Sequence, residues 1–81
     1  MMTDFIATKI LRIKHVQERI GLSRSAIYDR LNPRSPRYDK NFPAPFKIGI
    51  SAVGWSEGSI DEWVRHQIEV GYLKNKMNDE L

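Results

Sequence analysis

The sequence predicts a mainly helical domain in which three helices pack against a small two-stranded β-hairpin. Three observations support this fold class. Two short stretches with helical spacing of apolar residues are separated only by a glycine turn at Gly21. Residues 46–55 are rich in β-forming side chains and contain two glycines, as in a tight hairpin. A third amphipathic stretch follows, so the expected order is helix, helix, hairpin, helix.

The length and composition exclude several classes of protein. The 81 residues suffice for one domain and leave little room for a deep catalytic cavity. Cysteine is absent, which removes disulfides, zinc-finger thiolates and thiol nucleophiles and agrees with a cytoplasmic location. No apolar run approaches the roughly 20 residues of a transmembrane helix, and no signal-peptide core follows Met1, so we expect no membrane association.

Charge is unevenly distributed along the chain. The net charge is +3, but residues 9–47 contain ten basic and three acidic residues, whereas residues 48–81 contain three basic and six acidic ones. The ten basic residues of the first stretch are Lys9, Arg12, Lys14, Arg19, Arg24, Arg30, Arg34, Arg37, Lys40 and Lys47. This asymmetry is typical of a polyanion-binding half, although charge alone is equally compatible with a solvated basic face.

The first helix is predicted from the apolar residues Ile13, Val16 and Ile20, which recur at helical spacing. Gly21 ends it, because glycine takes the left-handed conformation that closes a helix at little steric cost. Residues 1–10 before it show no cap and little periodicity, and we expect them to form a loose lead-in.

The second helix is predicted from about Arg24 to about Leu31. Ser23 is its expected N-cap, since its hydroxyl can accept a hydrogen bond from an early amide of the helix. Pro33 ends it, because the residue before a proline is driven out of the α region. A glycine turn between two helices fits a helix-turn-helix and also an ordinary αα-hairpin; the basic balance favours the former.

The faces of this second helix differ in chemistry. Ile27 and Leu31 lie on one side and are expected to meet the first helix. Ser25, Tyr28, Asp29 and Asn32 occupy the other side, with Arg24 at its margin. We expect Tyr28 to be available to a phosphate or a base edge; the alternative is a tyrosine half-buried at the helix margin.

A loop, a hairpin and a last helix complete the predicted domain. Residues 32–46 hold all four prolines and form the loop, with Phe42 and Phe46 as expected core anchors together with Trp55 and Trp63. The hairpin has its tip near residues 49–52. The last helix begins after the N-cap Ser56, with Glu57, Asp61 and Glu62 favoured there by the helix dipole.

Gly71 is the expected end of the last helix. The domain is therefore predicted to span residues 11–71, with residues 72–81 as a flexible tail.

No residue pattern indicates catalysis. His15 and His66 lie on different predicted helices with no cluster of metal-ligating residues around them, so no metal site is expected. The serines form no nucleophile elbow, and no glycine-rich loop has phosphate-binding spacing. We predict a protein that is not an enzyme and needs no cofactor.

Three segments in order, GLSRSAIYDRL, FPAPFKIG and SAVGWSEGSIDEW, resemble the AlpA family of small phage- and prophage-associated transcriptional regulators. The resemblance covers about residues 11–70. It implies a winged helix-turn-helix, related in fold to MerR-type and excisionase-type domains. The second helix, about residues 23–32, would then enter the major groove of double-stranded DNA, and the hairpin would be the wing.

The resemblance also implies site residues. Ser23, Arg24, Ser25 and Tyr28 match the family's recognition segment. Lys47 and Gly49 match the lysine and glycine of the wing. Trp55 and Trp63 match the tryptophans that hold the wing and the last helix together.

Two departures from the family pattern concern the DNA contacts. Ile50, Ser51 and Ala52 stand where the family often places a wing arginine, so an arginine contact in the minor groove is not assumed, and Ser51 is the polar candidate there. The loop after the second helix also looks longer than usual. It brings further candidate phosphate contacts, which are Arg34, Arg37 and Lys40.

The function expected from these observations is sequence-specific DNA binding by a regulator of a phage-type element. One domain covers few base pairs, so a homodimer or adjacent copies on repeated half-sites are expected. Two alternatives stay open. One is an excisionase-like architectural factor that bends attachment-site DNA and assists an integrase. The other is a protein-interaction adaptor that uses the acidic last helix.

Overall fold

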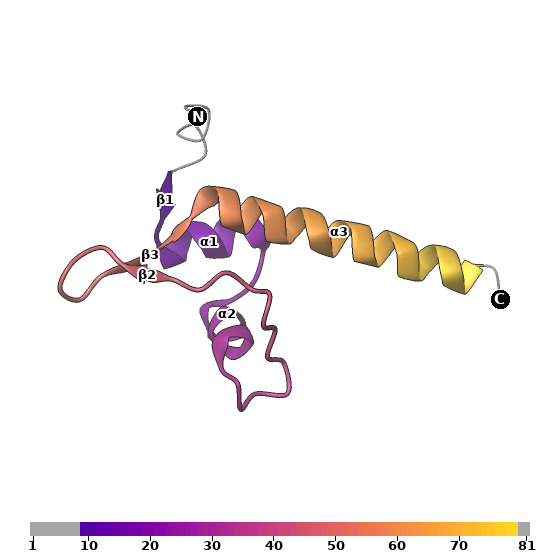
Figure 1. Ribbon diagram of the computed structural model, residues 1–81, viewed down its shortest axis with the longest axis horizontal. Coiled ribbons are helices and arrows are strands. Elements are labelled where there is room, and N and C mark those ends of the chain that lie inside the picture. Colours follow the sequence, from indigo (N-terminus) through magenta and orange to yellow (C-terminus); the bar gives the residue numbers. More distant parts are fainter. Residues whose placement is uncertain (1–8, 80–81) are drawn as a thin grey trace.

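The computed structural model describes the backbone of residues 9–79 and the side chains of residues 9–74. Within that part of the chain it has three helices and three short strands, as Figure 1 shows. In chain order they are β1 (Ile10–Leu11), α1 (Ile13–Ile20), α2 (Arg24–Leu31), β2 (Phe46–Lys47), β3 (Val53–Ser56) and α3 (Glu57–Asp79). The predicted fold class, three helices with a β-hairpin in a winged helix-turn-helix arrangement, is confirmed.

A glycine that ends α1 and a serine that caps α2 form the turn between these two helices. Gly21 has φ 71° and ψ 26°, the left-handed conformation, and its N–H donates to the carbonyl of Gln17 at 2.8 Å. The Ser23 Oγ accepts a hydrogen bond from the amide of Ala26 at 3.1 Å, which caps α2. Asn32, before Pro33, is extended and ends α2. The predicted end of α1, the cap and the bounds of α2 are therefore confirmed.

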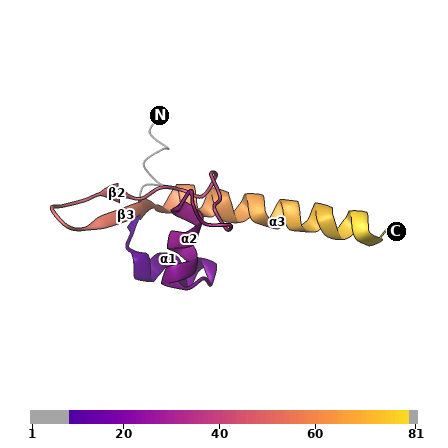
Figure 2. The same cartoon turned by 90° about the horizontal axis from the view of Figure 1, so that it is seen from below.

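The sheet is centred on β3, which pairs antiparallel with β1 on one side and β2 on the other. β2 and β3 form the predicted hairpin, here called the wing, with its tip at residues 48–52. The N–H of Ile48 donates to the carbonyl of Ala52 at 2.9 Å and closes the tip. Figures 1 and 2 both show the wing projecting from the helices, opposite to the far end of α3.

β1 was not expected, because Ile10 belongs to the predicted lead-in. Residues 1–8 of that lead-in lie outside the described residues. Ile10 pairs with Ser56 and Leu11 with Trp55. A Cβ at Gly54 would lie 2.5 Å from the Cγ2 of Ile10 and 3.3 Å from the carbonyl oxygen of Leu11, so any side chain at residue 54 would force the Ile10 side chain to move.

The core lies where α1, α2, β3 and α3 meet. Its fully or nearly buried members are Leu11, Val16, Ile27, Phe42, Trp55 and Ile60. Trp55 and Phe42 are core residues as predicted, and Trp63 packs against them while partly buried. Phe46 is not: 42% of it is exposed, because it lies on the wing's outer strand rather than over the helices.

Two indole N–H groups hold the proline loop (residues 32–45) to the core. Trp55 Nε1 donates to the carbonyl of Pro43 at 3.1 Å, and Trp63 Nε1 donates to Asp39 Oδ2 at 3.0 Å. The Phe42 ring stands edge-on to Trp63, with 4.8 Å between ring centroids. The loop is thereby joined to β3 and α3 by specific contacts rather than by chain connectivity alone.

α3 is longer than predicted, and Gly71 does not end it. Ser56 caps its start, since Ser56 Oγ accepts from the amide of Ser59 at 3.3 Å. The helix then continues through Gly71 to Asp79. Glycine inside a helix costs only about 1 kcal/mol relative to alanine, and no proline follows to stop the helix. The prediction that residues 72–79 lie beyond the helix is wrong.

No helix among residues 9–79 has the length and apolar character that crossing a membrane requires.

Candidate nucleic-acid interface

The N-terminal turn of α2 presents three of the predicted site residues to solvent. Ser23, Arg24 and Ser25 are all exposed. The guanidinium carbon of Arg24 lies 5.5 Å from the centre of the Tyr28 ring, within the range of a cation–π contact. That contact orients the arginine along the helix surface and leaves its N–H donors for other partners.

Tyr28 lies at the margin of α2. Its ring stands edge-on to the buried Trp55, with 6.3 Å between centroids and 64° between planes. The tyrosine is nevertheless 36% exposed. The contact ties α2 to β3 while part of the ring stays accessible, and the predicted contact of Tyr28 with DNA stays a prediction.

The proline loop carries three predicted cations on a series of tight turns. Side-chain oxygens of Asn32, Ser35 and Asp39 each accept a hydrogen bond from the amide two residues later, at 2.9–3.0 Å. Such turns fix a backbone without secondary structure. Arg34, Arg37 and Lys40 are held exposed on this framework.

Arg37 is the one predicted cation of the loop that faces a carboxylate among the described residues. Its Nη1 lies 3.9 Å from Asp29 Oδ2 of α2, and both side chains are well exposed. An ion pair of this length in solvent contributes little to stability. Arg37 can therefore leave Asp29 and bind another anion at little cost in stability.

The wing carries Lys47, Gly49 and Ser51, all exposed. No acidic residue occurs between Asp39 and Glu57, so the whole wing lacks negative charge. Gly49 does not have a positive φ. Among the described residues, a Cβ at Gly49 would meet only the Cβ of Ala52, at 4.0 Å.

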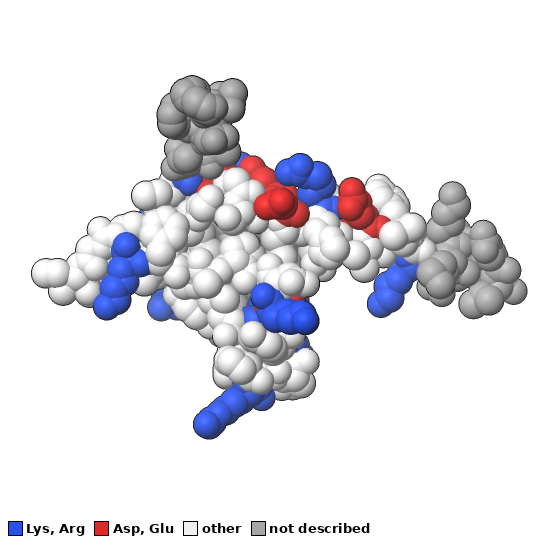
Figure 3. Space-filling model, viewed as in Figure 1, with Lys and Arg blue, Asp and Glu red and all other residues white. Residues whose placement is uncertain are grey.

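The structure brings some of the predicted site residues together and leaves others apart. Arg24 and Tyr28 are in contact, and Arg37 reaches α2. The wing residues connect to α2 through Trp55 of β3. Figure 3 shows Lys and Arg side chains over the wing and around α2, whereas the acidic side chains visible in that view gather along α3.

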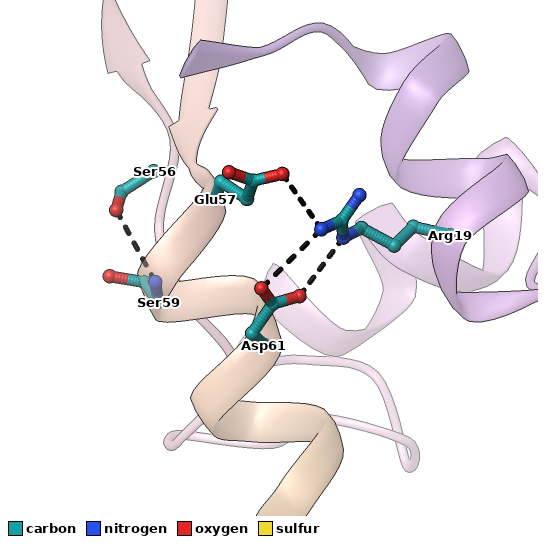
Figure 4. A network of polar contacts seen from close by, with 5 residues as sticks. All are labelled: Arg19, Ser56, Glu57, Ser59 and Asp61. Carbon is teal, nitrogen blue, oxygen red and sulfur yellow. Dashed lines mark hydrogen bonds and ion pairs between the residues drawn. The ribbon is translucent and has the colours of Figure 1, made fainter. Parts of the chain in front are cut away.

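Besides Arg37, three of the basic residues counted in the sequence have partners within the described part of the protein. Arg19 Nη2 lies 2.7 Å from Glu57 Oε2, and its Nε lies 2.9 Å from Asp61 Oδ1 (Figure 4). Arg12 Nε donates to the carbonyl of Val53, and Arg30 Nη1 donates to that of Ala26.

The Arg19 contacts shift two pKa values. The hydrogen bond from Arg19 lowers the pKa of Asp61 below its ordinary value, and the same bond raises the pKa of Arg19. Sequence reasoning explained Glu57 and Asp61 by the helix dipole and missed this contact. The residues are 38 and 42 positions from Arg19, and no local pattern links them.

The described part of the chain contains no group of three or more His, Cys, Asp or Glu side chains that could bind a metal ion. The arrangement instead offers exposed guanidinium and ammonium groups, hydroxyls and the first amides of α2. Exposed cationic and hydroxyl donors beside a helix N-terminus are the groups that bind phosphate and other anions.

Comparison with known proteins agrees with this chemistry. The family model described as Prophage CP4-57 regulatory protein (AlpA) matches residues 9–68. The chain is 44% identical over 69 residues to the DNA-binding transcriptional activator AlpA of Escherichia coli (strain K12), an alignment covering 85% of this chain and 99% of that protein. No solved structure gives a significant match. The chain belongs to the AlpA family of prophage regulatory proteins.

Proposed function

We propose that this protein is a DNA-binding transcription regulator of a phage- or prophage-type element. In this proposal α2 lies in the major groove, and the wing and the proline loop contact the phosphate backbone. The proposal rests on which basic side chains form ion pairs within the protein and which do not. Arg24, Arg34, Lys40 and Lys47 have no ion pair within the described residues, whereas Arg19 is engaged by two carboxylates.

The roles follow from how proteins divide their contacts to DNA. Arg34, Arg37, Lys40 and Lys47 neutralise phosphates, which gives affinity and salt dependence without sequence information. Arg24 reads a base edge, since arginine paired bidentately with guanine is the commonest specific contact in the major groove.

Ser23 and Ser25 hold a phosphate oxygen at the N-terminus of α2. The Ser23 oxygen already accepts from Ala26, so its hydroxyl proton remains for the phosphate. Tyr28 adds a contact from its exposed edge, and Gly49 and Ser51 let the wing approach the duplex closely.

One α2 covers only a few base pairs, so we propose that two copies act together as a dimer or on adjacent half-sites in cytoplasmic DNA. Half-sites about 10 base pairs apart place the two copies on the same face of the duplex, whereas half-sites about 15 base pairs apart, one and a half helical turns, place them on opposite faces. A dimer is expected to bind the first duplex more tightly than the second, and equal binding would contradict a fixed dimer.

The test of the function is selection of bound fragments from sheared genomic DNA, followed by competition between the recovered duplex and a scrambled one. Recovery of promoter fragments with a repeated motif supports a transcription regulator. Recovery of tandem sites at attachment regions supports the excisionase-like role with an integrase partner. Failure to retain any duplex at low salt, with a stable protein complex instead, contradicts DNA binding.

A further inference from the structure

The tip of the wing is the most exposed apolar feature that the structure describes. Ile50 is 98% exposed, so that almost none of its surface touches the protein. The exposed parts of Phe46 and Ile48 lie close to it along the same hairpin. An isolated exposed isoleucine is ordinary on a surface, but one at the end of a projecting hairpin is placed to enter a partner.

The fold does not explain why residues 49 and 50 are glycine and isoleucine. The tip is closed by backbone groups, the Ile48 amide and the Ala52 carbonyl, so the Ile50 side chain has no part in holding the hairpin. The conformation and surroundings of Gly49 would accept a side chain, as described above. The absence of a side chain at residue 49 keeps the tip narrow beside a bulky apolar residue.

Charge favours an anionic occupant for the wing, and the duplex that the proposed function brings beside α2 is the one we infer. Residues 40–56 contain Lys40 and Lys47 and no carboxylate, so a phosphate backbone can approach the wing without repulsion. When α2 occupies a major groove, the groove next to it along the duplex is the minor groove. That groove is only about 6 Å wide, and a tip of glycine, isoleucine and serine is slender enough to enter it.

We propose that Ile50 is an apolar wedge that inserts at a base step in the minor groove and kinks the duplex. Apolar side chains used in this way partly unstack the step and bend DNA by about 20–90° toward the major groove. The inference rests on the proposed function and adds a specificity element to it. The wedge selects flexible pyrimidine–purine steps, which unstack most easily, at a position where no base edge is read by a hydrogen bond.

The test uses the full chain and a random 30-base-pair duplex library, from which the wild type selects its ligand. The selected duplex is then labelled with dyes at both ends, so that energy transfer reports the bend, and with 2-aminopurine at the enriched step, so that fluorescence reports unstacking. The wild type is expected to enrich a TA or CA step beside the α2 site and to bend the duplex.

Ile50→Ala is expected to bind the selected duplex about tenfold more weakly, to lose the bend and to leave 2-aminopurine quenched. Ile50→Phe keeps an apolar wedge and is expected to retain both signals. Ile68→Ala, which removes an exposed isoleucine from α3, is the matched control and should change neither. Because Ile50 contacts almost nothing, the melting temperature of Ile50→Ala should equal that of the wild type.

The outcomes separate the wedge from the function on which it rests. A wild type that binds a selected duplex without bending it, or an Ile50→Ala variant that bends it equally, overturns the wedge and leaves DNA binding intact. The second result would also be expected if the tip contacts a protein. Failure of the wild type to select any duplex overturns both the proposed function and the wedge.

Discussion

Two regions of this molecule use the same residue type in opposite ways. At the α1–α3 junction, Arg19 is surrounded by Glu57 and Asp61 and fastens one helix to the other. On the side formed by α2, the proline loop and the wing, Arg24 and Arg34 face solvent without a carboxylate among the described residues. The number of basic residues in a chain is therefore a poor measure of the size of a nucleic-acid-binding surface. What matters is how many of them the fold leaves without an internal partner.

Trp55 connects the two regions. It is completely buried, donates its indole N–H to the proline loop and supports the ring of Tyr28. It also sits on β3, which leads directly into α3.

Trp55→Ala should have the largest effect, since it removes the support of both regions. Truncation of a buried aromatic residue costs about 3–5 kcal/mol, and this domain has a small core. Urea unfolding measures the loss. Trp55→Phe is the milder companion, because it keeps a ring but deletes the hydrogen bond to Pro43. Equal stability of Trp55→Ala and the wild type would show that the core is built differently.

Arg24→Ala should weaken binding to the selected duplex by about 1–3 kcal/mol while leaving the melting temperature unchanged, because its proposed contact is with a base edge and its side chain is exposed rather than part of the core. The control is Arg65→Ala, which removes an exposed arginine from α3. Competition with a scrambled duplex distinguishes the roles: an equal loss on both sequences would assign Arg24 to phosphate rather than to a base.

The double variant Arg34→Ala with Arg37→Ala tests the proline loop. Each phosphate contact contributes about 0.9 to the slope of log affinity against log salt concentration. Two lost contacts should therefore reduce that slope by about 2, equally on specific and scrambled duplexes. Affinity measured from low to moderate salt gives the slope, and an unchanged slope would exclude the loop from the interface.

Asp61→Asn should have the smallest effect, because it alters an exposed ion pair. The pKa of Asp61 is lower in the folded protein than its ordinary value of 3.8. Its contribution to stability is therefore fully present above about pH 4 and is lost as the pH falls through the lower, folded pKa.

Thermal unfolding at several pH values tests this sign. The wild type should be slightly more stable than Asp61→Asn near neutral pH, and the gap should close in acid. Glu62→Gln, a neighbouring exposed acid outside the Arg19 network, should show no such gap. A difference that grows in acid would contradict the assigned direction.

The features predicted well from sequence are those decided by residues close together in the chain. Gly21, Ser23 and Pro33 set the turn and the ends of α2 through backbone conformation and capping within a few positions. The hairpin likewise follows from adjacent β-forming residues and glycines. These signals needed no knowledge of the tertiary structure.

The features that were missed depend on contacts between distant residues. β1 forms because Ile10 and Leu11 pair with β3, about 45 positions later in the chain. A strand of two residues has too short a sequence pattern to predict such a pairing. The contact of Tyr28 with Trp55 and that of Arg19 with Asp61 also join residues far apart in the sequence. α3 continues beyond Gly71, where the sequence predicted its end, because a single glycine weakens a helix without ending it. The predicted site residues remain to be tested on DNA.

β3 ends at Ser56 and α3 begins at Glu57, with no residue between them. A direct junction of this kind leaves no linker in which a change of direction could be absorbed. The course of the wing and the course of α3 are therefore set together, by the same few residues around Ser56 and Glu57.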